Sequence, residues 1–336
     1  MKFKLLAGAV IAVIVGVSVW WLLAARAQEA ALAGWLAERR AAGWQAEAAD
    51  VSILGFPNRL DLKLTEPALA DPASGWAWSA PWFEVAHLIY QPSLFIGIWP
   101  PEQRLAAPGG RAVLRTETMK ASFRTETSAA LPLVRASLDI ERGALAADAG
   151  WTAGAARISA HVRAAPDAGP ENAYEFRADG LRLRLPNHIR ALLDPTDTLP
   201  PAIETVTLEG RAAFDRPLDR FALEGPKPGL RLLSLDAADA EWGRLKLTVS
   251  GSMKADAEGY GEGEFAIGAT NWTAMLDAAA ASGALSAPFV ETLKTGLGFV
   301  ARLTGDGETL NVSLSLSGGY ARIGPVPIGR APRLID

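Results

Sequence analysis

The sequence predicts a mainly β protein with a few helices, of the α+β class, in which an N-terminal transmembrane helix precedes large curved antiparallel β-sheets. Two observations carry this prediction. The chain begins with an unbroken apolar run, and its remainder contains repeated stretches in which apolar and polar residues strictly alternate. Such alternation is typical of antiparallel strands with one buried and one solvated face. A long sheet of this kind is expected to curve into an elongated groove or a half-barrel.

The apolar run spans Leu5–Ala25, 21 residues without a charge. As a helix it covers roughly 31 Å, the thickness of a bilayer core. Basic residues beside a span tend to stay in the cytoplasm, and aromatic residues gather at the membrane interface. We therefore expect residues 1–27 to form a cytoplasmic tail and a single-pass inner-membrane anchor, with the body of the protein in the periplasm. The expected interface anchors are Lys2, Lys4, Trp20, Trp21 and Arg26.

A cleaved signal peptide is the alternative interpretation of this run, because Ala25-Arg26-Ala27 offers a small-residue cleavage site. The apolar region of a signal peptide usually extends over about 7–15 residues. The run here is longer and ends near two tryptophans, which favours a retained anchor. A stalk helix is then expected at residues 28–43, where Leu32, Trp35 and Leu36 share one face and Gly43 suits the position just after a helix end.

Alternation begins after this helix and recurs along the body. Six stretches show it clearly: 60–65, 134–141, 158–163, 181–185, 245–249 and 310–316. Proline-rich breaks separate some of them, at 100–101, 166–170 and 195–201. The last break follows a predicted short helix at 187–193, so we expect it to divide a first β-rich unit, 44–199, from a second, 200–336.

Two further helices are expected in the second unit. Asn271 is predicted to cap the first of them, which ends at Gly283, and Ser286 is predicted to cap the next. Such a pair would cover part of one sheet face. Between the strands, the acidic and glycine-spaced segment 256–263 is predicted to be a hairpin rather than a phosphate-binding or calcium-binding loop.

Composition and charge argue against several classes of function. Three of the 33 Lys and Arg residues and none of the 37 Asp and Glu residues fall in the first 26 positions, so the body carries a net charge of −7. An acidic body argues against nucleic acid as a partner. The chain has no cysteine, and its three histidines are far apart. We therefore predict no catalytic, cofactor-binding or metal-binding residues, and no enzymatic activity.

Aromatic residues are concentrated between residues 76 and 99, where four tryptophans lie among prolines. Packing in a core is one interpretation of this segment, and an apolar groove or a rim near the membrane is the other. The positions expected to line a groove are Leu62, Trp78, Trp82, Leu183 and Leu247.

Several short strings occur along the body in a set order. They are Gly55-Phe56-Pro57-Asn58-Arg59-Leu60-Asp61, Trp76-x-Trp78-x-Ala80-Pro81, Tyr90-Gln91-Pro92, Trp242-Gly243-x-Leu245, Gly259-Tyr260-Gly261-Glu262-Gly263 and Ile323-Gly324-Pro325-Val326-Pro327-Ile328-Gly329. In these strings the chain, from about residue 30 onward, resembles a bacterial family catalogued as domain of unknown function 2125. That family has no established activity, so the resemblance implies no site residues. The layout is also similar to that of AsmA-like envelope proteins, which implies a long sheet with an apolar concave face.

The function expected from these features is binding or passage of phospholipid, or of another apolar ligand, along an apolar groove beside the inner membrane. An open sheet with one apolar face has to bury that face against helices, a second sheet or a ligand. The alternative is an envelope scaffold that binds other proteins through sheet edges or through the Trp-rich segment.

Overall fold

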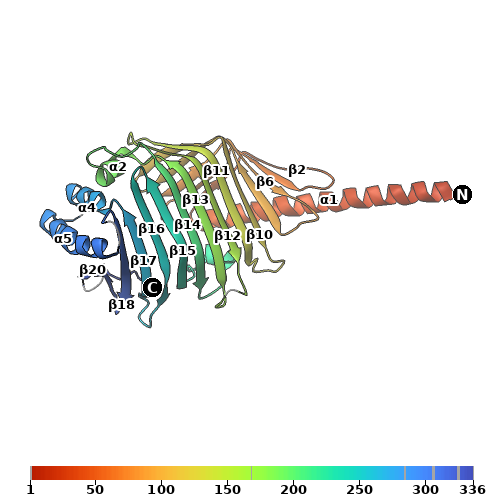
Figure 1. Ribbon diagram of the computed structural model, residues 1–336. Helices are drawn as coiled ribbons and strands as arrows, with labels where there is room; N and C mark the ends of the chain where they lie inside the picture. Colours follow the sequence, from red (N-terminus) through yellow and green to blue (C-terminus); the bar gives the residue numbers. More distant parts are fainter. Residues whose placement is uncertain (1, 168, 284, 305–306, 324–325, 336) are drawn as a thin grey trace. The chain divides into compact units, whose positions relative to one another are not determined.

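The computed structural model describes residues 2–167, 169–283, 285–304, 307–323 and 326–335 (Figure 1). The predicted class is confirmed: the body is mainly antiparallel β-structure preceded by one long apolar helix. The chain forms two compact units. Unit 1 comprises Met1–Thr127 with Leu145–Gly150, and unit 2 comprises Ser128–Ala144 with Trp151–Asp336.

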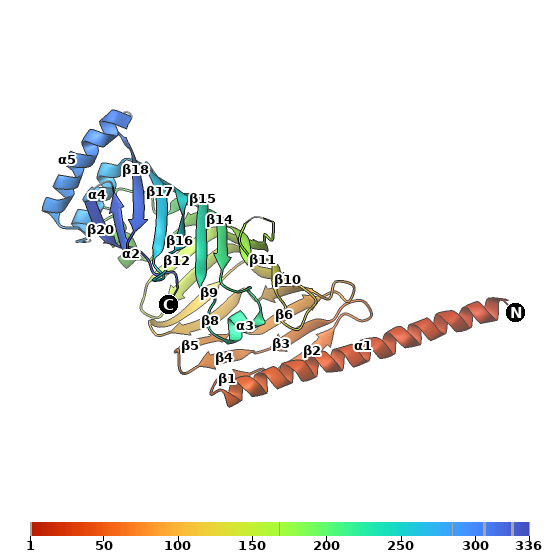
Figure 2. The same cartoon turned by 90° about the horizontal axis from the view of Figure 1, so that it is seen from below.

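Helix α1 (Lys2–Ala41) is continuous over 40 residues, so the expected membrane span and the expected stalk helix are one element. It ends as predicted, because Gly43 adopts a positive φ of 88° and donates its N–H to the carbonyl of Arg40. The second half of α1 lies along unit 1 in Figure 2, where the Arg40 guanidinium donates to the carbonyl of Ala46 and Leu36 is buried. Most of the described side chains in the first half are exposed.

Unit 1 contains ten strands that pair in two antiparallel ribbons. The first ribbon has the order β1 (Gln45–Glu47), β4 (Ala68–Asp71), β5 (Trp76–Ser79), β8 (Glu102–Ala107) and β9 (Gly110–Arg115). The second has the order β2 (Asp50–Leu54), β3 (Asp61–Thr65), β6 (Trp82–His87), β7 (Leu94–Trp99) and β10 (Thr118–Thr125).

Each strand of one ribbon continues into a strand of the other through a break of two residues. The breaks lie at 48–49, 66–67, 80–81, 100–101 and 116–117. Hydrogen bonds connect neighbouring breaks: Ala80 donates its N–H to Pro67, and Thr116 donates to Pro101. Prolines occupy three of the breaks because they lack the N–H that a continuing ladder needs. We call this row of interruptions the break line.

Aromatic side chains meet across the break line. The ring centroids of Trp78 and Phe83 lie 5.9 Å apart although a break separates the two residues, and Phe83 lies 4.8 Å from Trp99. The Trp78 indole N–H donates to the buried amide of Gln103 at 2.9 Å. Trp78 and Trp99 of the Trp-rich segment therefore pack against their neighbours across the break line, as core residues do.

Unit 2 is an antiparallel meander in which each strand from β12 to β20 pairs with the next one in sequence (Figure 1). The strands are β12 (Thr152–Ala164), β13 (Ala173–Leu183), β14 (Ile203–Phe214), β15 (Leu230–Trp242), β16 (Leu245–Ala255), β17 (Gly261–Thr270), β18 (Thr309–Ser317), β19 (Tyr320–Ile323) and β20 (Val326–Arg330). Strand β11 (Leu133–Ala147) begins in unit 2 and ends in unit 1. The segment 256–260 is the predicted hairpin turn, in which the Asp256 carboxylate accepts the N–H groups of Glu258 and Tyr260.

The described part of unit 2 contains four helices: α2 (Asn187–Leu193), α3 (Arg220–Glu224), α4 (Trp272–Ala281) and α5 (Ala287–Thr304). Helices α4 and α5 cover one end of the sheet, where Trp272 and Ala301 pack with Ala269 and Leu310. The prediction that the Asn271 side chain caps α4 is wrong. Asn271 adopts a left-handed conformation, and its amide instead donates to the carbonyl of Arg244.

The break at residues 195–201 connects α2 to β14 within unit 2. Strands β13 and β14, on either side of this break, pair directly from Ala173↔Ala213 to Leu183↔Ile203. Because a continuous ladder crosses the expected boundary at 199/200, both sides of it belong to one sheet.

We expect the substitution Gly210→Ala to destabilise unit 2. A β-bulge at Gly210 brings the strands so close that an added Cβ would lie 2.1 Å from the carbonyl oxygen of Ser234. Forcing a methyl group into such a contact costs about 1–3 kcal/mol of unfolding free energy. Thermal unfolding of the detergent-solubilised chain measures the loss. Gly109→Ala is the matched control, because no atom lies within 4 Å of its added Cβ, and equal melting temperatures for the two variants would contradict the prediction.

Candidate functional site

One face of the unit 2 sheet is apolar across six or more consecutive strands. The registers align Ala160, Ala178, Leu208, Ala238, Val249, Ile267 and Val312 in one row. The next row contains Ile158, Gly180, Val206, Ala240, Leu247, Ala269 and Leu310. The alternation visible in the sequence thus places apolar side chains of neighbouring strands side by side. We call this surface the apolar face.

The opposite face of the same strands is polar and charged. Arg177 bonds both to Asp179, at 2.8 Å, and to Glu209, at 2.5 Å. The hydrogen bonds from Arg177 lower the pKa of the Asp179 carboxyl, against the opposing effect of its partial burial. Exposed pairs of this kind contribute little to stability. This face is therefore a solvated surface that keeps the sheet soluble on one side.

Part of the apolar face remains uncovered. Helices α4 and α5 bury its end at β17 and β18, but Leu208 on β14 and Leu247 on β16 are 36% and 37% exposed. Two large aliphatic side chains in the middle of an apolar surface are thus open to solvent. Full burial of a leucine contributes about 1.5–3 kcal/mol, so covering the remaining third of each side chain would contribute about 0.5–1 kcal/mol.

An apolar pocket of about 320 Å³ lies at the border between this open region and the helices. Side chains from α2, α4 and β14–β16 line it: Leu192, Leu193, Ile203, Ala240, Trp242, Leu245, Leu247, Met275, Ala278, Ala279 and Ser282. A second depression, of about 350 Å³, shares Leu193, Leu245 and Ala278 with it and has a more polar lining that includes Arg244, Thr198 and Asp194. The two depressions are neighbours, one apolar and one more polar, and we refer to the pair as the groove. An apolar surface beside a polar one has the chemistry that an amphiphile needs.

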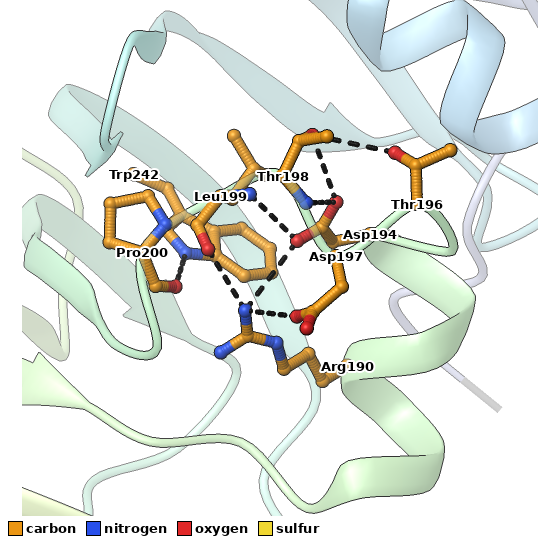
Figure 3. Close-up of polar contacts among 8 residues, drawn as sticks. All are labelled: Arg190, Asp194, Thr196, Asp197, Thr198, Leu199, Pro200 and Trp242. Carbon is orange, nitrogen blue, oxygen red and sulfur yellow. Dashed lines mark hydrogen bonds and ion pairs between the residues drawn. The ribbon is translucent and has the colours of Figure 1, made fainter.

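A buried carboxylate holds one wall of this groove (Figure 3). Asp194, 4% exposed, follows α2 and accepts the N–H groups of Thr198 at 3.0 Å and Leu199 at 2.9 Å. Arg190 bonds to Asp197 at 2.6 Å and to the carbonyl of Leu199 at 2.9 Å. The Trp242 indole donates to the carbonyl of Pro200 at 2.8 Å. These contacts fix α2, and with it Leu192 and Leu193, against the ends of the strands.

The charge state of Asp194 follows from these contacts. Burial by itself would raise the pKa of its carboxyl group. The hydrogen bonds from Leu199 and Thr198 and the nearby charge of Arg190 outweigh burial, so the pKa is lowered below its ordinary value. Asp194 is therefore an ionised structural group at neutral pH.

Two of the predicted groove-lining residues lie on the apolar face. Leu247 lines the pocket, and the side chain of Leu183 lies over Gly180 of the same face. The predicted alternation of Leu181 with Leu183 is interrupted, because Arg182 has a φ of 50°. Leu181 pairs with Thr205 and Arg157 in a polar row and is exposed. The physical cause is a local irregularity that moves Leu183 to the face of Gly180.

The other three predicted lining residues belong to unit 1. Leu62 pairs with Val85 and shares the face of Phe83, because Leu64 pairs with Phe83 two residues further. Trp78 packs against Phe83 and also borders an open depression of about 500 Å³ over the first ribbon. Trp82 is adjacent to Phe83 in β6 and so projects from the opposite face, because successive side chains of a strand alternate.

The predicted membrane-interface residues all lie on α1. Trp20 is about half exposed and Arg26 is exposed. Trp21 is only partly exposed, because it contacts Arg59 in the loop between β2 and β3. The side chains of Lys2 and Lys4 lie outside the described side chains. Helix α1 is the one helix in the described part of the chain that is long and apolar enough to cross a membrane.

Sequence reasoning missed Leu208, the α2 leucines and the Asp194 cluster. Leu208 carries the alternating pattern Val206-Thr207-Leu208-Glu209, so the signal for it was present. Asp194 offers no such signal, because its partners become neighbours only when the 194–200 loop folds. Among the described residues, no group of three or more His, Asp and Glu side chains is placed to hold a metal ion.

Comparison with known proteins gives one match. No curated protein and no solved structure matches the chain, and the likeness to AsmA-like envelope proteins is not shown. The model of one protein family, by contrast, matches residues 21–332, which includes nearly the whole body and the last part of the apolar run. The chain therefore belongs to the family described as "Uncharacterized protein conserved in bacteria (DUF2125)".

Proposed function

We propose that this protein is a non-enzymatic, membrane-anchored protein of the periplasm that binds the acyl chains of phospholipid, or of a similar apolar ligand, on the apolar face of unit 2. The observation that carries the proposal is the exposure of Leu208 and Leu247 in the middle of that face, beside a pocket lined by aliphatic side chains. Lys2 and Lys4, which precede the apolar half of α1, support a single-pass anchor in the inner membrane with the N-terminus in the cytoplasm.

The lining of the pocket supports binding rather than catalysis. Ser282 and the indole of Trp242 are its polar side chains among the eleven residues described there, and the indole N–H is already bonded to Pro200. Such a surface offers contact area to hydrocarbon and no acid or base to a reacting group. The polar depression beside it, with Arg244 and Thr198, would face the headgroup of an amphiphile.

Native mass spectrometry of the full chain, extracted in mild detergent, tests this proposal. We expect mass additions that correspond to phospholipid, and we expect them to disappear after extensive exchange into a delipidating detergent. A chain that carries no lipid immediately after gentle extraction, and that takes up none from added phospholipid micelles, would contradict the proposal.

The alternative function is an envelope scaffold, which would need the Trp-rich segment or a sheet edge to be free for binding. Trp78 and Trp99 of the Trp-rich segment pack against Phe83, which leaves Trp76 as its most exposed tryptophan, 62% exposed. The edge strand β20 carries Pro327, which weakens strand addition along it. A lipid-free protein that still forms a defined complex in the envelope would favour the scaffold.

A further inference from the structure

One end of unit 1 contains two adjoining hairpin loops, one of which contacts helix α1. The loop 55–60 connects β2 to β3, and the loop 88–93 connects β6 to β7. Leu60 donates its N–H to the carbonyl of His87 at 2.9 Å, and Arg59 forms a β-bridge with Leu88. We call this pair of loops the tip.

The tip contacts α1 at Trp21. The indole N–H of Trp21 donates to the carbonyl of Arg59 at 2.7 Å, and its ring meets Phe56 edge-on with the centroids 5.5 Å apart. Trp21 lies four residues before Ala25, the last residue of the apolar run. Four residues of helix correspond to about 6 Å. The tip therefore reaches past the end of the apolar run toward the N-terminus of α1.

The tip presents apolar and aromatic side chains to the outside. Phe56 is 54% exposed, Tyr90 is 66% exposed and Leu54 is 50% exposed. On strands β6, β7 and β10, the ring of His87 stacks on Phe95 and Phe95 stacks on Phe123, with centroids 4.9 Å and 5.0 Å apart. Large apolar side chains rarely gather on an exposed loop without a partner, and aromatic side chains favour the boundary between hydrocarbon and headgroups.

We propose that the tip inserts Phe56 and Tyr90 into the interface of the same bilayer leaflet that α1 leaves. The contact between Trp21 and Phe56 sets the depth, because a tryptophan about 6 Å from the end of a span lies at the hydrocarbon boundary. An interfacial protein segment buries its apolar side chains about 5–10 Å into this region. The inference rests on the membrane anchorage proposed above but does not depend on lipid binding by unit 2.

The absence of cysteine from the sequence allows a direct test. Single cysteines at Phe56→Cys and Tyr90→Cys carry an environment-sensitive fluorophore in the full chain, reconstituted into vesicles of phosphatidylethanolamine and phosphatidylglycerol. Phospholipids with a nitroxide quencher near the headgroup or near the chain end report the depth of the fluorophore. The matched control is Ala73→Cys, an exposed residue in the loop at the other end of β4 and β5. Val13→Cys reports the middle of the span.

We expect the fluorophores at residues 56 and 90 to be quenched several-fold more than the one at residue 73, with the shallow quencher the more effective. At residue 13 the deep quencher is the more effective. Equal quenching at residues 56, 90 and 73 with a quenched residue 13 overturns the inference and leaves the anchorage intact. No quenching at residue 13 overturns both. If loss of the Phe56 ring weakens the fold, the Tyr90→Cys variant still tests the inference. Among the described contacts, Tyr90 makes none with Trp21.

Discussion

The double substitution Leu208→Asp and Leu247→Asp is expected to lower the amount of phospholipid that co-purifies with the full chain by at least about tenfold. Both leucines are exposed by more than a third on the apolar face, so a ligand would bury them further. Covering the remaining third of each side chain contributes about 0.5–1 kcal/mol, so the pair contributes about 1–2 kcal/mol, and about 1.4 kcal/mol corresponds to a factor of ten in affinity. A carboxylate placed against an acyl chain adds a desolvation cost to this loss.

The control for this substitution is Ser250→Asp. Ser250 follows Val249 of the apolar face on β16 and is exposed, so Ser250→Asp adds one carboxylate to the opposite face of the strand that carries Leu247. Lipid content by mass spectrometry should stay at the wild-type level in this variant. Circular dichroism shows whether lipid is lost because the binding surface has changed or because the protein has unfolded. If the two leucines line the binding surface, the double variant keeps its β-sheet signal while it loses lipid. Unchanged lipid in a folded double variant would rule out the apolar face as the binding surface.

The substitution Asp194→Ala is expected to lower the free energy of unfolding of unit 2 by about 2–4 kcal/mol. It removes a buried acceptor and leaves the N–H groups of Thr198 and Leu199 without their partner. The segment 187–200 should then exchange its amide hydrogens faster, and the melting temperature of the detergent-solubilised chain should fall. Lipid retention should fall too, since α2 carries Leu192 and Leu193 into the pocket.

Asp197→Ala is the matched control, because Asp197 bonds to the same Arg190 but its side chain is 81% exposed. An exposed pair contributes at most about 1 kcal/mol, so this variant should melt close to the wild-type temperature. Equal losses in the two variants would show that the charge of Arg190, and not the buried acceptor, holds the loop.

The stabilising effect of Asp194 should also depend on pH. Its pKa is lower in the folded chain than the value of about 3.9 for an unfolded aspartate, so its contribution is complete above that value and is lost as the pH falls through the folded pKa. The difference in stability between the wild type and Asp194→Ala should therefore be constant near neutral pH and shrink below about pH 4. Chemical unfolding of both proteins across this range measures the difference, and a gap that widens on acidification would contradict the assignment.

Strands with a strict period of two could be predicted from the sequence because the two faces of a sheet differ in solvation. The stretch Leu245–Val249 lies in β16, and the short helix expected at 187–193 coincides with α2. The apolar face follows from the same pattern once neighbouring strands are in register. Register itself is a tertiary property, which is why the sequence showed that Leu247 is apolar-facing but not that it lies beside Met275 of α4.

Local irregularities of the backbone could not be predicted from the alternation of apolar and polar residues. Arg182 takes a left-handed backbone conformation and so moves Leu183 relative to Leu181, although the two residues look equivalent in sequence. The prolines at 67, 81 and 100–101 are far apart in the sequence, and of these only 100–101 was predicted to be a break. Only pairing between distant strands shows that they align in one break line. The single helix α1 was divided at residue 27 because its composition changes there, whereas backbone hydrogen bonding continues through the change.

Because α1 is continuous, its two halves tilt together as one rigid rod. Transmembrane helices tilt by about 20° on average, and they change this tilt when the thickness of the bilayer changes. Residues 22–41 extend about 30 Å beyond Trp21 without a break. A change in tilt of about 20° would thus swing the far end of unit 1 sideways by about 10 Å, because no joint absorbs the rotation. For the anchorage proposed above, the orientation of unit 1 would therefore depend on the thickness of the bilayer.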